Sequence, residues 1–219
     1  MNLSSVNVRS VMDLESLTNP YVRKIQVHRE YFHRSLECFT EKDSSFRPSN
    51  DCLTVAGQVI HVIFGIEFCL SGMFGSYDGI TPVSQRKRGF NDLDWTVWAS
   101  EMNLSEALDA EAFPEAIEGS RSLIKAMVLF DQAMDIAANM FVSKTVEEIE
   151  TEPLPENPLW APEFRYPDIL EVMNDHTAHH RGSLAVYARL LGKESKFPYR
   201  ELSEARKEEE TSRVRLVLE

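Results

Sequence analysis

Three of the six histidines fall within five residues, at positions 176, 179 and 180. On an α-helix, His176 and His180 lie one turn apart on the same face, with about 5–6 Å between their Cβ atoms, so two imidazoles could bind one divalent metal ion. Both lie on an apolar stripe, where a buried polar nitrogen without a partner costs about 1–3 kcal/mol. A shared metal ion removes that cost. We therefore predict a metal site that uses His176 and His180.

A third ligand must come from elsewhere in the chain, and His61 is the best candidate. It lies in the middle of an apolar run, 53–74, which the pattern predicts to be a buried helix. Gly57 and Gly65 lie four residues before and after His61. Because glycine has no side chain, these positions would let another helix approach closely. Three neutral imidazoles with an open fourth position suit Zn²⁺, Ni²⁺, Fe²⁺ or Mn²⁺. For His61 taken alone, a core histidine without a metal is the alternative.

The remaining histidines have weaker patterns. His179 lies about 100° round the helix from its neighbour, on a side with Asp175, and is either a donor or acid/base group beside the metal or a surface residue. Glu30 and His33 match one Glu-x-x-His of a carboxylate-bridged di-iron bundle, but that architecture needs a second copy. We therefore predict a solvated helix face for this pair and a packing role for His28.

The elements that must position these residues are helices. Apolar residues recur with helical period in four segments, and no run alternates as a strand does. The segments are about 20–42, 53–74, 114–142 and 167–192. Asn19 followed by Pro20 predicts the start of the first helix, and Gly192 predicts the end of the last. The chain is therefore predicted to be all-α, a four-helix bundle.

Three segments connect or extend the bundle. Residues 76–112 contain most of the turn signals and form a long connection between the second and third helices, which is expected to be a lid or a dimer contact. A proline-rich loop, 153–167, precedes the last helix. The charged stretch 200–219 is predicted to be a solvated helix or a mobile tail. One domain, 1–199, with a tail, 200–219, follows from this organisation.

Composition and charge exclude several functions. With 219 residues, 43% hydrophobic and 26% charged, the chain has the composition of a globular protein. The net charge of −12 predicts no binding to nucleic acid, and the one basic patch, Arg86-Lys87-Arg88, is predicted to be a solvated loop. The chain shows no unbroken apolar run of about 18 residues and no secretory pattern, so we predict a cytoplasmic protein outside the membrane.

The three cysteines argue against a disulfide framework. Cys38, Cys52 and Cys69 are odd in number and lack CxxC spacing. We predict buried or free thiols, with a catalytic cysteine as the weaker alternative.

The segment 176–192, His-Thr-Ala-His-His-Arg-Gly-Ser-Leu-Ala-Val-Tyr-Ala-Arg-Leu-Leu-Gly, resembles the motif of the DinB/YfiT-like superfamily of four-helix metal-binding proteins. His61 in a buried second helix strengthens the resemblance, which covers roughly 20–199. It implies an up-down-down-up bundle that binds a divalent metal through His61, His176 and His180. One departure is Ser183, where the family often has glutamine.

The resemblance also implies a chemistry. Characterised relatives include transferases and isomerases that use low-molecular-weight thiols, in which the cation would favour the thiolate that attacks an electrophile. We therefore expect a metal-dependent enzyme with a small-molecule substrate, most simply a thiol transferase. The alternatives are a non-catalytic metal-binding or stress-response module, or a metal-dependent hydrolase with His179 or Asp175 as base. A homodimer is expected for such a bundle.

Overall fold

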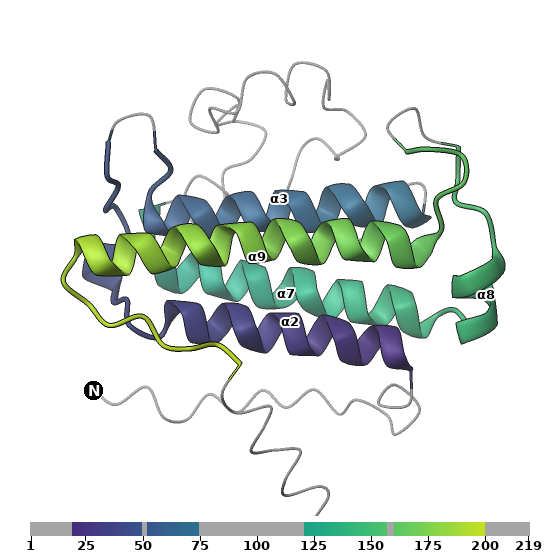
Figure 1. Ribbon diagram of the computed structural model, residues 1–219, viewed down its shortest axis with the longest axis horizontal. Helices are drawn as coiled ribbons and strands as arrows, with labels where there is room; N and C mark the ends of the chain where they lie inside the picture. The colour runs from purple at the N-terminus through teal and green to yellow at the C-terminus, as the bar shows by residue number, and fades with distance from the viewer. Residues whose placement is uncertain (1–18, 50–51, 75–120, 157–159, 200–219) are drawn as a thin grey trace, which may run out of the picture.

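The computed structural model describes residues 19–49, 52–74, 121–156 and 160–199. Within these ranges the chain forms helices and connecting segments, without a strand. The elements are α2 (Pro20–Leu36), the 3₁₀ helix η1 (Glu41–Asp43), α3 (Val55–Phe74), α7 (Leu123–Val142), α8 (Val146–Thr151) and α9 (Tyr166–Leu190) (Figure 1). The predicted connection 76–112, with its basic patch, and the predicted tail 200–219 lie outside the described residues.

The start of α2 follows from its first two residues. Oδ1 of Asn19 accepts hydrogen bonds from the backbone N–H groups of Tyr21 (3.0 Å) and Val22 (3.4 Å), and Pro20 occupies the first turn, where no N–H is needed. The Asn19 amide also donates to the carbonyl oxygen of Phe141 (3.2 Å). One residue therefore caps α2 and joins it to the end of α7, and the predicted start is confirmed.

The predicted ends of the last helix are also confirmed, to within two residues. At its start, Pro167 lies in the first turn and the Asp168 carboxylate accepts from the backbone N–H of Arg165 (2.8 Å). Beyond its end, Gly192 has a φ of +68°, a left-handed conformation that glycine adopts readily. Its N–H donates to the carbonyl oxygen of Arg189 (3.0 Å). These local bonds fix the length of α9.

The first helix ends earlier than predicted, at Leu36 and not near Lys42. The reason is a second start signal just beyond it. The backbone N–H and hydroxyl of Thr40 donate to the Asp43 carboxylate (2.6 and 2.8 Å), and these bonds need an extended backbone at Thr40. The chain therefore leaves the α-helix and begins the short helix η1.

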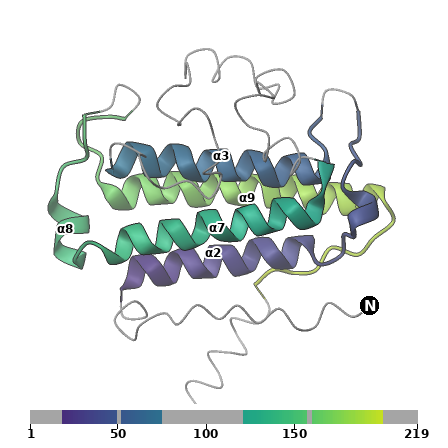
Figure 2. The ribbon, with the colours of Figure 1, turned by 180° about the vertical axis from the view of Figure 1, so that it is seen from behind.

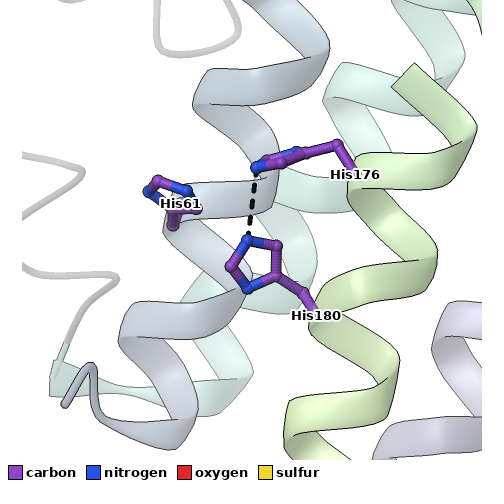
Figure 3. A group of neighbouring side chains, drawn as sticks. All are labelled: His61, His176 and His180. Carbon is purple, nitrogen blue, oxygen red and sulfur yellow. Dashed lines mark hydrogen bonds between the residues drawn. The ribbon is translucent and has the colours of Figure 1, made fainter. Parts of the chain in front are cut away.

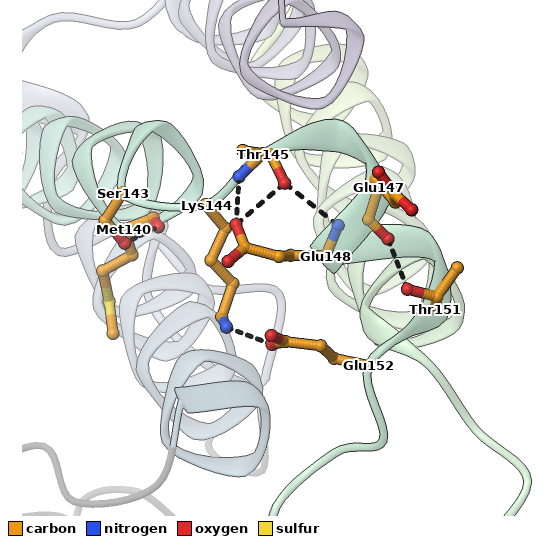
Figure 4. A network of polar contacts seen from close by, with 8 residues as sticks. All are labelled: Met140, Ser143, Lys144, Thr145, Glu147, Glu148, Thr151 and Glu152. Carbon is orange, nitrogen blue, oxygen red and sulfur yellow. Dashed lines mark hydrogen bonds and ion pairs between the residues drawn. The ribbon is translucent and has the colours of Figure 1, made fainter.

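A short helix, α8, follows α7 where no helix is predicted. Thr145 and Glu148 form a reciprocal cap, in which the Thr145 backbone N–H (2.6 Å) and hydroxyl (2.8 Å) donate to the Glu148 carboxylate (Figure 4). Lys144 forms an ion pair with Glu152 across this turn. The Thr-x-x-Glu spacing was the sequence signal for α8. This turn carries the chain from the end of α7 towards the start of α9.

The four long helices form a bundle in which α3 and α2 each pack against α7 and α9 (Figures 1 and 2). Lys24 and Glu171 pair at 3.2 Å near the starts of α2 and α9, so these two helices run in parallel. The rings of Phe74, at the end of α3, and Tyr166, at the start of α9, are 5.2 Å apart. Helices α2 and α9 therefore run one way, and α3 and α7 the other.

The core lies along the bundle axis. Its largest fully buried side chains include Phe32, Phe64, Phe130 and Phe141, and the rings of Phe32 and Phe130 stack at 4.5 Å. Helix α3 is buried on nearly every side, as its composition predicts. Helices α3 and α9 pack directly against each other in this core.

Helix α3 is also long and apolar enough, by length and composition alone, to cross a membrane. Gln58, His61 and Glu67 interrupt its apolar residues, so a search for an unbroken apolar run does not find it. Most of α3 is buried inside the bundle, and the core helix of a soluble protein passes the same test. The helix is therefore weak evidence for a membrane span.

Candidate metal centre

The three predicted histidines meet between α3 and α9 (Figure 3). His61 comes from the middle of α3, and His176 and His180 come from successive turns of α9. One possible ligand nitrogen from each ring lies within 4.8 Å of the other two. The Nε2 atoms of His176 and His180 are 3.2 Å apart. The structure therefore brings the three residues into one group.

Gly65 makes room for one of these rings. A Cβ atom at Gly65 would lie 2.3 Å from Nδ1 and Cε1 of His176, far inside van der Waals contact. The His176 ring therefore lies against bare backbone of α3. At Gly57 the nearest atoms to such a Cβ would be those of Thr54 and Leu53 in the preceding segment. The close approach that the glycines allow is therefore found at Gly65.

A chain of hydrogen bonds leads away from His180. Its Nδ1 contacts Oε1 of Gln58. The Gln58 amide nitrogen donates to the Tyr187 hydroxyl (3.2 Å). This hydroxyl in turn donates to the carbonyl oxygen of Leu53 (3.0 Å). Gln58 and Tyr187 are both buried. Gln58 is not among the residues predicted from the sequence to belong to the site. A usable signal was present, namely a lone amide three residues before His61 in an apolar helix.

The electrostatics of the group keep its imidazoles neutral. Burial, together with smaller contributions from His176 and His179, lowers the pKa of His61 to about 4. Burial also lowers the pKa of His180 to about 2, with the other three histidines contributing. The pKa of His176 is lowered for the same reasons, burial first and then His179. At neutral pH each ring can therefore offer a nitrogen lone pair without first losing a proton.

The spacing and the donor set fit a divalent cation. Imidazole nitrogens bound to tetrahedral zinc at about 2.0–2.1 Å lie about 3.3–3.4 Å apart, close to the 3.2 Å between the Nε2 atoms of His176 and His180. Among the residues that the structure describes, no carboxylate or thiol joins the group. It is therefore a set of three nitrogen donors that could hold a metal ion.

His179 and Asp175 lie outside the group. Both side chains are exposed on α9, although the His179 ring meets the His180 ring edge-on with 5.0 Å between centroids. Ser183 donates back to the carbonyl oxygen of His179 (3.4 Å) and so bonds within its own helix. An acid/base role for His179 or Asp175 stays a prediction.

The histidines of α2 also lie apart from the group. Nε2 of His33 contacts Oδ1 of Asp131 on α7 (2.6 Å). Glu30 is exposed and accepts from Arg34 one turn along the same helix (2.8 Å). The Glu-x-x-His pair therefore does not converge on a common site, in agreement with a solvated helix face. His28 is half-buried.

All three cysteines are free thiols, as predicted. Burial raises the pKa of Cys69 to about 12. Burial also raises the pKa of Cys38, against the opposing effect of its backbone hydrogen bond and Lys193. A raised pKa disfavours the thiolate, which is the nucleophilic form. Neither residue is therefore suited to nucleophilic catalysis.

Comparisons with models of known protein families, with curated protein sequences and with solved structures each find no match. The resemblance of the segment 176–192 to the DinB/YfiT-like superfamily therefore stays a prediction. The candidate metal centre depends on its own residues and their geometry.

Proposed function

We propose that this protein binds a divalent metal ion through His61, His176 and His180 and uses it in catalysis. The observation that carries the proposal is the set of three neutral imidazoles, brought together by two helices, which no further histidine, cysteine or carboxylate joins as a possible ligand among the described residues. Structural zinc sites are closed by four protein ligands, whereas catalytic sites keep one position open. Three ligands therefore favour a catalytic site.

Two features support a protein of the DinB/YfiT-like kind. The segment 176–192 carries the resemblance in sequence. The directions of the four long helices, with α2 and α9 opposed to α3 and α7, are the up-down-down-up order that the resemblance implies. We propose this superfamily for the chain on those grounds.

We propose transfer of a low-molecular-weight thiol to a small electrophile as the reaction. A divalent cation in an open site acts as a Lewis acid that lowers the pKa of a thiol or water beside it. Three neutral rings would hold the cation, with His61 and His180 buried and His176 partly buried. Its own Cys69 and Cys38 have raised pKa values, which supports an external thiol as nucleophile. The S–H bond breaks and its proton passes to solvent. The sulfur bonds to the electrophilic carbon, and the group it displaces leaves with the electron pair of the broken bond.

Metal analysis tests the site directly. We expect untagged wild-type protein to carry close to one equivalent of Zn, Ni, Fe or Mn by plasma mass spectrometry, and His180→Ala to lose it. His33→Ala is the matched control, because His33 pairs with Asp131 on another face. Wild-type protein without metal, or equal loss in both variants, would contradict the proposal.

The reaction needs a second test. Cobalt-substituted protein should develop a thiolate-to-metal charge-transfer band when a thiol is added, and should consume thiol in the presence of suitable electrophiles. A bound ion with neither band nor turnover would mean a non-catalytic module, in which the metal joins α3 to α9. Ester hydrolysis without thiol would instead indicate a hydrolase.

A further inference from the structure

The buried chain of polar groups beside His180 has a defined direction. The carbonyl oxygen of Leu53 can only accept, so the single hydroxyl hydrogen of Tyr187 is donated to it (3.0 Å). The Tyr187 oxygen is then left to accept from its side-chain neighbours, the Gln58 amide (3.2 Å) and the Cys52 thiol. If the Gln58 amide were flipped, its Oε1 would face the Tyr187 oxygen, and neither atom would have a hydrogen to donate. The Gln58 amide therefore presents its nitrogen to Tyr187.

The same direction continues to the imidazole. With its nitrogen committed to Tyr187, Gln58 presents Oε1 to Nδ1 of His180. A carbonyl oxygen accepts only, so Nδ1 of His180 carries the hydrogen. A neutral imidazole has one N–H, which leaves a lone pair on Nε2. That atom lies 3.2 Å from Nε2 of His176, on the side where the three histidines meet.

We propose that Gln58, oriented by Tyr187, is a positioning residue that holds His180 as the Nδ1–H tautomer and directs its Nε2 lone pair to a divalent cation. The inference deepens the proposed function and rests on the metal site named there. Partners of this kind behind a ligand set the orientation and basicity of the imidazole. Since Gln58 is three residues before His61, the same face of α3 supplies one ligand and orients another.

The tautomer can be read in metal-free protein. Long-range ¹H–¹⁵N correlation spectra separate protonated from unprotonated ring nitrogens, and the His180→Ala variant assigns the signals. We expect Nδ1–H for His180 in wild-type protein and a shift towards Nε2–H in Gln58→Met, which keeps the side-chain length but offers no comparable acceptor. The Nε2–H tautomer in wild-type protein, or an unchanged tautomer in Gln58→Met, would overturn the inference.

Metal affinity supplies the second readout. We expect Gln58→Met to bind cobalt about 10–100-fold more weakly than wild-type protein, the usual effect of losing such a partner. Gln58→Glu keeps an acceptor opposite Nδ1 and should bind more tightly than Gln58→Met. The matched control is Gln26→Met, because Gln26 is on α2 and its buried amide nitrogen has no hydrogen-bond partner among the residues that the structure describes. Equal affinities of Gln58→Met and Gln26→Met would count against the inference.

Tyr187→Phe keeps the test decisive if Gln58→Met does not fold. This variant leaves the Gln58 acceptor in place but frees the amide to turn. We therefore expect a shift towards the Nε2–H tautomer of His180 that is smaller than in Gln58→Met.

The two proposals can fail separately. An Nδ1–H tautomer that depends on Gln58 in a protein that binds no metal would refute the metal site alone. Tight metal binding with a tautomer indifferent to Gln58 and Tyr187 would refute the positioning role alone.

Discussion

Two interfaces of the bundle carry histidine with polar neighbours, and they differ in what surrounds the ring. We call the group His61, His176, His180 and Gln58, between α3 and α9, the histidine seam, and the group Arg29, His33, Asp131 and Asp135, between α2 and α7, the acidic seam. The acidic seam is partly exposed, with 37% of the His33 side chain and 33% of the Asp131 side chain accessible. The rings of His61 and His180 are buried, at 4% and 6%.

Charge separates the two seams further. On the acidic seam, Arg29 pairs with Asp131 (2.8 Å) and with Asp135 (2.6 Å), and His33 shares Asp131. Both carboxylates of this group thus already have a cationic partner, and their side chains are partly exposed. The histidine seam has no carboxylate within the described part of the chain, only neutral nitrogens. Residue type and helical spacing are therefore insufficient to define a metal site; burial and the absence of a competing charge decide it.

The largest expected effect comes from Gly65→Ala, which breaks the histidine seam without removing a ligand. The new methyl group would overlap the His176 ring, so the ring must turn away. We expect a fall in cobalt affinity of at least about 100-fold, the upper end of the effect of losing an outer partner, measured by competition titration. Gly182→Ala is the control, because nothing lies within 4 Å of its Cβ position. It should leave affinity unchanged and stabilise α9 by up to about 1 kcal/mol.

A ring that stayed in place would refute this reasoning. Equal cobalt affinities of Gly65→Ala and Gly182→Ala, with both variants folded, would mean that the close approach of His176 to α3 is not needed for the site.

A smaller effect is expected on the acidic seam. Asp131→Asn removes the charge shared by Arg29 and His33, and we expect the free energy of unfolding to fall by about 1 kcal/mol, as for a partly exposed ion-pair network. Urea denaturation measures this, and the effect should shrink at high salt because exposed pairs are screened. Metal content should not change. A loss of metal in Asp131→Asn would show that the two seams are not independent.

The smallest expected effect is on the pH dependence of folding stability and comes from His28, a second histidine of α2. Burial, with smaller contributions from the charges of Arg181 and Lys24, lowers the pKa of His28 to about 4. Within the described ranges no carboxylate pairs with it, in contrast to His33. Below its unfolded pKa of about 6.5, the unfolded chain binds a proton that the folded chain does not. Folding stability from this residue is therefore present above pH 6.5 and lost as the pH falls towards 4.

Denaturation of metal-free protein at a series of pH values between 7 and 4 tests this sign. The His28→Gln variant should lose less stability than the wild type over that range, by less than about 1 kcal/mol because water screens a half-buried side chain. The opposite order of the two proteins would mean that His28 gains a stabilising partner when it is protonated.

Much of the candidate site was predictable from neighbours in the sequence. His176 and His180 share a face because they are one helical turn apart. Asn19, through its side chain, and Gly192, through its backbone, mark helix ends because their hydrogen bonds lie within the same turn. The apolar composition of α3 predicted its burial, and with it the position of His61. Each of these inferences depends on residues within one or two turns of one another.

The end of α2 and the presence of α8 were not predicted correctly, because local hydrogen bonds override the periodic pattern at both places. The bonds between Thr40 and Asp43 end α2 early, and those between Thr145 and Glu148 begin α8. Both spacings were visible in the sequence. Periodicity alone did not show that these short-range bonds would outcompete continuation of α2 or an irregular loop after α7.

The sequence by itself determined the helical composition, the shared face of His176 and His180, and the candidate third histidine. Only the tertiary structure decided that Gly65, and not Gly57, receives the neighbouring ring, and that Gln58 and Tyr187 orient His180. The reason is physical. Contacts along one helix are set by a fixed rise and turn, whereas contacts between α3 and α9 depend on how two helices slide and rotate as the whole core packs, which no local pattern specifies.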